Sequence, residues 1–131
     1  MAKEGSRSLS IFLHGEITKE ILGAAFAVQK EFGYGFLEKI YENSMVIEIQ
    51  ERGLQVRQQV PIDVFYKNIM VGHYIADLFV ADNVIVELKT ERAYISRHEA
   101  QLLHYLRATR VKVGMLLNFG ELKCEYKRLV L

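Results

Sequence analysis

Two acidic residues and a lysine fall close together in the middle of the chain. Asp77 lies near the end of a run of β-branched and aromatic residues, and Glu87 and Lys89 lie two residues apart in the next apolar run. Side chains two residues apart on a strand point to the same face of a sheet. The intervening Asp82-Asn83 predicts a turn that pairs the two strands antiparallel, with residue 77 opposite about residue 88. We therefore expect Asp77 to lie near Glu87 and Lys89.

This grouping is compatible with divalent-metal chemistry. A carboxylate and an ammonium in an apolar strand lose hydration free energy unless they are paired or bind a metal. Two neighbouring carboxylates repel each other, and a divalent cation relieves the repulsion. Carboxylate oxygens select Mg²⁺ or Mn²⁺ over Zn²⁺, and such a cation can activate a bound water. Taken alone, however, the segment favours a buried salt bridge from Lys89 to Glu87 or Asp77, with no metal.

Further polar residues share helix faces that could supply partners to these three. Glu38 and Tyr41 are three residues apart, and Glu42 is four residues from Glu38, so all three lie on one side of a predicted helix. Gln101 and Tyr105 are four residues apart on a later predicted helix. Their types and spacing indicate polar groups directed at a site, although a partly exposed helix flank is the alternative.

Hydrophobic periodicity predicts an α/β domain with a central mixed sheet flanked by helices, in the order α-α-β-β-β-α-β-β. Residues 1–14 are expected to form an N-terminal arm and residues 15–131 a single domain. The expected helices are Gly15–Phe32, Leu37–Arg52 and Ser96–Thr109, and the expected strands are Val56–Tyr66, Ile69–Val80, Val84–Lys89, Val111–Asn118 and Lys123–Leu131.

The composition excludes several classes of protein. The chain has 131 residues, of which 50% are hydrophobic and 25% charged, as in an ordinary globular domain rather than a disordered chain. One cysteine, Cys124, excludes an intrachain disulfide and a four-cysteine zinc or iron–sulfur site. The net charge of +1 indicates no bulk attraction to nucleic acid. No apolar run is long enough to span a membrane, so we expect a cytoplasmic protein.

Four motifs in order carry a family resemblance. The segment Gly35–Tyr41 reads GFLEKIY and matches G-x-x-E-x-x-Y. Together with Asp77, the Glu87-Leu88-Lys89 triplet and Gln101…Tyr105, it resembles the GxxExxY family of the PD-(D/E)xK nuclease-like superfamily over about residues 15–130. The Gln-x-x-x-Tyr element is further similar to the RecB-type exonuclease branch. Relatives in that branch often carry a cysteine-ligated iron–sulfur cluster, for which this chain lacks the cysteines.

The resemblance implies a restriction-endonuclease-like core and a role for each acidic residue. Asp77 and Glu87 would bind a divalent metal, Mg²⁺ or Mn²⁺, and Glu38 would complete the site directly or through water. Lys89 would orient the attacking water and stabilise charge on the phosphate. Tyr41, Gln101 and Tyr105 would bind the substrate or position the site.

These roles imply a metal-dependent nuclease acting on DNA or RNA. The alternative is a catalytically silent nuclease fold that binds nucleic acid or another protein. A structural subunit that forms a homodimer through an exposed strand, such as the last one, is a third hypothesis.

Overall fold

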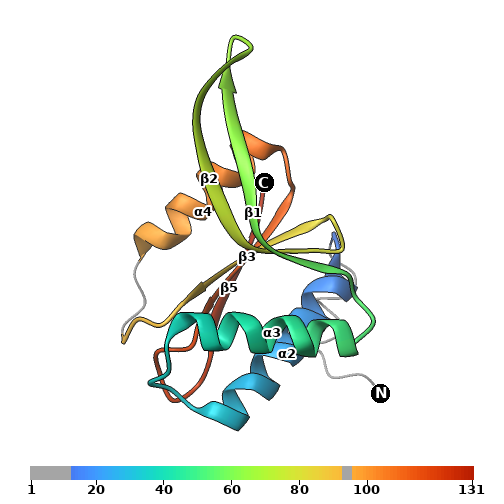
Figure 1. Cartoon of the computed structure of the whole chain (residues 1–131), viewed down its shortest axis with the longest axis vertical. Coiled ribbons are helices and arrows are strands. Elements are labelled where there is room, and N and C mark those ends of the chain that lie inside the picture. Colours follow the sequence, from blue (N-terminus) through green and yellow to red (C-terminus); the bar gives the residue numbers. More distant parts are fainter. Residues whose placement is uncertain (1–12, 93–95) are drawn as a thin grey trace.

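The computed structural model describes residues 13–92 and 96–131, which form a five-stranded sheet with helices on both faces (Figure 1). The elements are α2 Gly15–Phe32, α3 Glu38–Glu51, β1 Val56–Tyr66, β2 Ile69–Val80, β3 Val84–Lys89, α4 Ser96–Thr109, β4 Val113–Asn118 and β5 Glu125–Val130. The predicted α/β class and element order are confirmed, and each predicted boundary lies within two residues of the observed one. The predicted arm, residues 1–14, lies almost entirely outside the described residues.

The strands follow the order β1-β2-β3-β4-β5, and β3 and β4 form the parallel pair of the sheet. A parallel pair requires a crossover connection, and the segment containing α4 supplies it by leaving the end of β3 and returning to the start of β4. Because helices cover both faces of β3 and β4, the two strands are almost continuously apolar.

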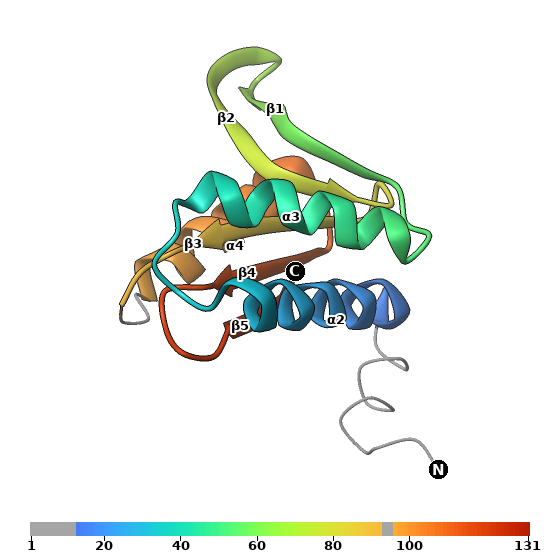
Figure 2. The ribbon, with the colours of Figure 1, turned by 60° about the horizontal axis from the view of Figure 1, so that its bottom comes forward.

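Helices α2 and α3 lie on one face of the sheet and α4 on the other (Figure 2), and each face has its own core. The first core joins α2 and α3 to Val84, Val86 and Leu88 of β3. The second core joins α4 to Ile85. Since side chains alternate along a strand, Glu87 and Lys89 continue the Ile85 face and lie on the α4 side. The charged residues therefore occupy the end of a central strand, beyond the apolar packing of α4.

The register of β2 and β3 corrects the sequence prediction by one residue. The turn is the three-residue loop Ala81–Asn83 rather than Asp82-Asn83 alone, with left-handed φ values of 52° and 54° at its first two residues. Leu78 pairs with Val86, so the next step along the ladder places Asp77 opposite Glu87. Directly opposed residues share a face, whereas residue 77 opposite residue 88 would have placed the two carboxyls on opposite faces.

The β1–β2 hairpin extends beyond the rest of the sheet (Figure 1). Its turn is Lys67-Asn68, as predicted, and both residues have the left-handed φ typical of a type I′ turn. Across the described parts of the chain, no helix is long and apolar enough to cross a membrane.

Candidate active site

The carboxyl groups of Asp77 and Glu87 lie against each other where β2 and β3 pair. Asp77 Oδ2 accepts a hydrogen bond from the backbone N–H of Leu88 at 2.8 Å. The Glu87 carboxyl lies beside Asp77, close enough for the charge and the hydrogen-bonding groups of Asp77 to shift the pKa of Glu87. The backbone of β3 thus fixes the carboxyl of Asp77, and the predicted proximity of the two residues is present in the structure.

Burial changes the protonation of this pair. Desolvation, followed by the charge of Asp77 and the hydrogen bond to it, raises the pKa of Glu87 from 4.5 to about 9, while the Lys89 charge opposes the shift. At neutral pH without a metal, the Glu87 carboxyl therefore carries a proton, and it does so beside Asp77. One proton holds together two groups that would otherwise repel each other.

Two buried polar atoms beside this pair have no partner. Glu87 Oε1 and the Tyr74 hydroxyl are buried and make no hydrogen bond. Burial, and then the charge of Glu87, raise the pKa of Tyr74 above its usual range, so the phenol remains a donor. Buried polar atoms are rarely unpaired in native proteins, and unpaired ones next to carboxylates indicate a place for a water or a cation. The donor set consists of hard oxygens and fits Mg²⁺ or Mn²⁺.

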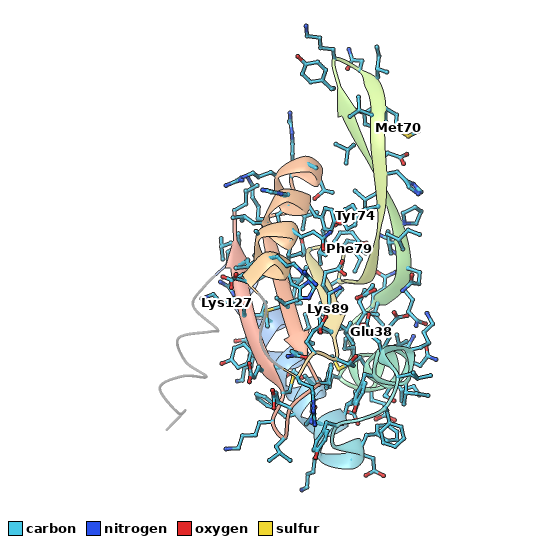
Figure 3. The ribbon with its side chains drawn as sticks, turned by 90° about the vertical axis from the view of Figure 1, so that its left-hand side faces the viewer. Glu38, Met70, Tyr74, Phe79, Lys89 and Lys127 are labelled. Carbon is cyan, nitrogen blue, oxygen red and sulfur yellow. The ribbon has the colours of Figure 1, made fainter. Side chains whose placement is uncertain are left out.

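Glu38 faces the same region from the first turn of α3 (Figure 3). Desolvation, and next the charge of Asp77, raise the pKa of Glu38, and the charge of Lys89 lowers it. Yet within the ranges 13–92 and 96–131, no three His, Cys, Asp or Glu side chains are close enough to form a ready-made metal site. The predicted triple set of Glu38, Asp77 and Glu87 is therefore not preassembled. A water between Glu38 and the cation suits Mg²⁺, which keeps several waters and needs only one or two carboxylates.

Lys89 is half-buried beside the acidic residues (Figure 3). The alternative of a salt bridge from Lys89 to Glu87 or Asp77 is wrong, because no ion pair of the described residues includes Lys89. Its charge still favours the ionised forms of Glu38 and Glu87. The ammonium thus remains available to an anionic ligand.

Tyr41 lies in the core rather than on the surface. Its side chain is fully buried, its hydroxyl donates to the Gly33 carbonyl at 2.7 Å, and its ring stacks on Phe119 with centroids 4.7 Å apart. A ring without exposed surface does not contact a substrate. Of its two predicted roles, only positioning is compatible with this burial, since Tyr41 fixes the start of α3 and hence Glu38.

The two predicted residues of α4 differ in their surroundings. Tyr105 stacks on Tyr74 with ring centroids 3.3 Å apart, and burial, followed by the charge of Glu87, raises the Tyr105 pKa. Because Tyr105 belongs to α4 and Tyr74 to β2, the stacked pair bridges α4 and the hairpin. Gln101, one turn earlier, is exposed and makes no hydrogen bond with the described residues. The structure thus brings Tyr105, but not Gln101, to Glu87.

Sequence reasoning missed Tyr74 and the contacts that fix the chain after Lys89. The buried Asn118 side chain accepts the N–H groups of Glu91 and Gly120 at 2.9 and 3.0 Å and donates to the Glu91 carbonyl at 3.0 Å. Glu91 Oε1 in turn lies 3.3 Å from His98 Nε2. The position of Asn118, a polar amide at the end of the otherwise apolar β4 sequence, could have indicated that its side chain has a specific partner. Tyr74 carries no such local signal, because only the tertiary fold brings it to Glu87.

Comparison with known proteins gives the fold and the family. The crystal structure of SSO0001 is similar, with a TM-score of 0.58 and 15% identity, over 89% of this chain and 57% of that one. This chain thus spans a little over half the length of SSO0001, and at this identity the likeness shows the fold alone. No curated protein matches. Residues 15–129, which contain every candidate site residue, match the model of the PD-(D/E)XK nuclease superfamily, and the chain belongs to that superfamily.

Proposed function

We propose that this protein is a divalent-metal-dependent nuclease that hydrolyses phosphodiester bonds of DNA or RNA. The observation that carries the proposal is the half-buried Asp77–Glu87 pair, in which the buried Oε1 of Glu87 has no hydrogen-bond partner. The Lys89 ammonium beside the pair makes no ion pair with the described residues. Membership of a nuclease superfamily supports nucleic acid as the substrate.

Each residue has a chemical role in this proposal. Asp77 and Glu87 would hold Mg²⁺ or Mn²⁺, which when bound supplies an activated water and neutralises charge on the phosphate. Binding requires Glu87 to release its proton, because a metal ligand must be deprotonated. Lys89 donates a hydrogen bond to a phosphate oxygen, where its charge offsets the negative charge that grows during attack. Glu38 would help to hold the cation through a hydrogen bond with water.

We also propose the finer placement in the GxxExxY family, with a RecB-type relationship. Its support is the motif residue Glu38 at the site, Tyr41 fixing the helix that carries it, and Tyr105 facing Glu87. Gln101 is the weakest part of the motif, because its exposed side chain reaches the site only if substrate or metal binding draws it inward.

A cleavage assay with matched carboxylate variants tests the function. Labelled single- and double-stranded DNA and RNA are incubated with protein and Mg²⁺, Mn²⁺ or EDTA. We expect cleavage of at least one substrate with metal, and none with EDTA or with Asp77→Asn. The control Glu51→Gln removes an exposed carboxylate at the end of α3 and should cleave like the wild type. Cleavage that persists in EDTA or in Asp77→Asn would contradict the proposal, as would nucleic-acid binding without cleavage.

A further inference from the structure

Gln59 has an unusual backbone for a strand residue. Its φ is 51°, a left-handed value that residues other than glycine rarely adopt. Every other described residue with such a φ lies in a turn or loop or at a helix end. The β1–β2 ladder skips Gln59, which lies opposite Asp77 between the pairs Gln58–Leu78 and Val60–Ala76. The irregularity therefore falls at the position of the candidate metal ligand.

At this position, the side chains that one series of alternate residues directs at the first core pass to the second core on the other face of the sheet. Before Gln59, Val56 packs in the core beneath α2 and α3, and after it Val60 packs in the core beneath α4. In a regular strand these two residues would share a face, because they are four positions apart. On β2, Leu78 lies in the first core and Ala76 in the second. A local irregularity of this kind redirects side chains and is common next to active sites.

The side chain of Gln59 joins α3 to Asp77. Its Nε2 donates to Glu42 Oε1 at 2.7 Å and lies 3.5 Å from Asp77 Oδ1. Glu42 is almost fully buried, and its other oxygen accepts from Lys39 at 2.8 Å and from Gln58 at 2.7 Å. The Gln59 amide thus extends from a fixed carboxylate to Asp77, whose Oδ2 already accepts the Leu88 N–H.

We infer that Gln59 is a positioning residue that fixes the orientation of the Asp77 carboxyl relative to Glu87. One amide nitrogen carries two hydrogens, so it can face both carboxylates at once. Because the amide is neutral, it adds no charge that competes with a cation. The long contact to Asp77 Oδ1 leaves lone pairs on that oxygen for a metal. That Gln59 thereby serves metal binding rests on the proposed function.

The chain provides a matched control. Gln58 also donates to Glu42, but its second contact is Asn43 Oδ1 at 2.8 Å instead of Asp77. Gln58→Leu and Gln59→Leu therefore each remove one hydrogen bond to Glu42, and only Gln59→Leu removes the contact to Asp77. Gln59→Gly removes the side-chain amide but adopts the left-handed backbone without strain. This variant therefore separates a role of the Gln59 side chain from a role of its backbone conformation.

Amide hydrogen exchange of Leu88 in the metal-free protein reports directly on Asp77, because the Leu88 N–H donates to Asp77 Oδ2. We expect Leu88 to exchange about fivefold faster in Gln59→Leu and Gln59→Gly, as the loss of one hydrogen bond implies, and about as in the wild type in Gln58→Leu. Mn²⁺ titration by calorimetry should show about tenfold weaker binding in both Gln59 variants. The Gln58 variant should bind Mn²⁺ like the wild type.

The two measurements separate this inference from the proposed function. Unchanged Leu88 exchange in the Gln59 variants overturns the inference, as does an equal effect of Gln58→Leu. Wild-type behaviour of Gln59→Gly would assign Gln59 to the backbone bend alone and also overturns it. Wild-type protein that binds no Mn²⁺ refutes the proposed function, while Leu88 exchange still decides the role of Gln59.

Discussion

Replacement of Glu87 by glutamine should make the metal-free protein more stable at neutral and alkaline pH. In the folded protein the pKa of Glu87 is raised to about 9, mainly by burial and then by Asp77. The unfolded chain releases the same proton near pH 4.5. The folded state thus binds a proton that the unfolded state has lost, so stability falls as pH rises between these two values. A glutamine amide keeps the donor to Asp77 and does not titrate.

The magnitude follows from one proton. Between about pH 5.5 and 8.5 the folded state holds this proton and the unfolded state does not, so the free energy of unfolding falls by about 1.4 kcal/mol per pH unit. From pH 6 to pH 8 the wild type should lose about 3 kcal/mol relative to Glu87→Gln. This dependence of the unfolding free energy on pH requires only that the pKa of Glu87 in the folded protein lie above the pH range of the measurement. It does not depend on the exact pKa.

Urea unfolding of both proteins at pH 6, 7 and 8, in EDTA, measures this difference. Subtracting the two curves removes the titration of every other group. Equal slopes for the two proteins would refute the protonated Glu87–Asp77 pair. Saturating Mg²⁺ provides a second comparison, because binding displaces the proton and should flatten the slope of the wild type only. A slope that Mg²⁺ leaves unchanged would count against the metal site, but not against the protonated pair.

Three further substitutions test other parts of the structure. Lys89→Met should abolish cleavage while keeping Mn²⁺ affinity within about threefold of wild type, since an ammonium is not a ligand; calorimetry showing lost binding would contradict this. Tyr105→Leu should lower the free energy of unfolding in urea by about 1 kcal/mol, because the stacked contact with Tyr74 is lost. An unchanged free energy of unfolding would show that this contact does not stabilise the fold. Gly120→Ala should cost about 1–3 kcal/mol or more by the same measurement, because a Cβ there would lie 2.0 Å from the Glu91 carbonyl oxygen; wild-type stability would show that this backbone can move apart.

Much of the fold was predictable because local signals and the global structure agree. The apolar face of α2, the glycine that follows α3 and the Lys67-Asn68 turn each depend on a few neighbouring residues. Gly53, for example, adopts a φ of 84°, and its N–H and that of Leu54 donate to the carbonyls of Gln50 and Ile49, as expected for a glycine helix stop. Such signals need no knowledge of distant contacts.

The register of the site strands was harder to predict than the strands themselves. The Asp82-Asn83 pair suggested a two-residue turn, but Ala81 and Asp82 take the left-handed backbone and the loop has three residues. Alanine carries no turn signal, so the one-residue difference was invisible locally. Because a slip of one residue exchanges faces, the correct register depends on burying Val84 and Val86 beneath α3.

The Asp77–Glu87 pair lowers the stability of the metal-free fold. Glu87 lies on the face of β3 where α4 packs over Ile85, and an apolar side chain there would extend that core. Instead the protein keeps an acid whose ionisation opposes folding, beside a glutamine in a strained backbone. Both features weaken the metal-free fold, and both lie at the candidate metal site. If Glu87→Gln is more stable but cannot cleave nucleic acid, that loss of stability is the cost of holding a carboxylate ready to exchange its proton for a cation.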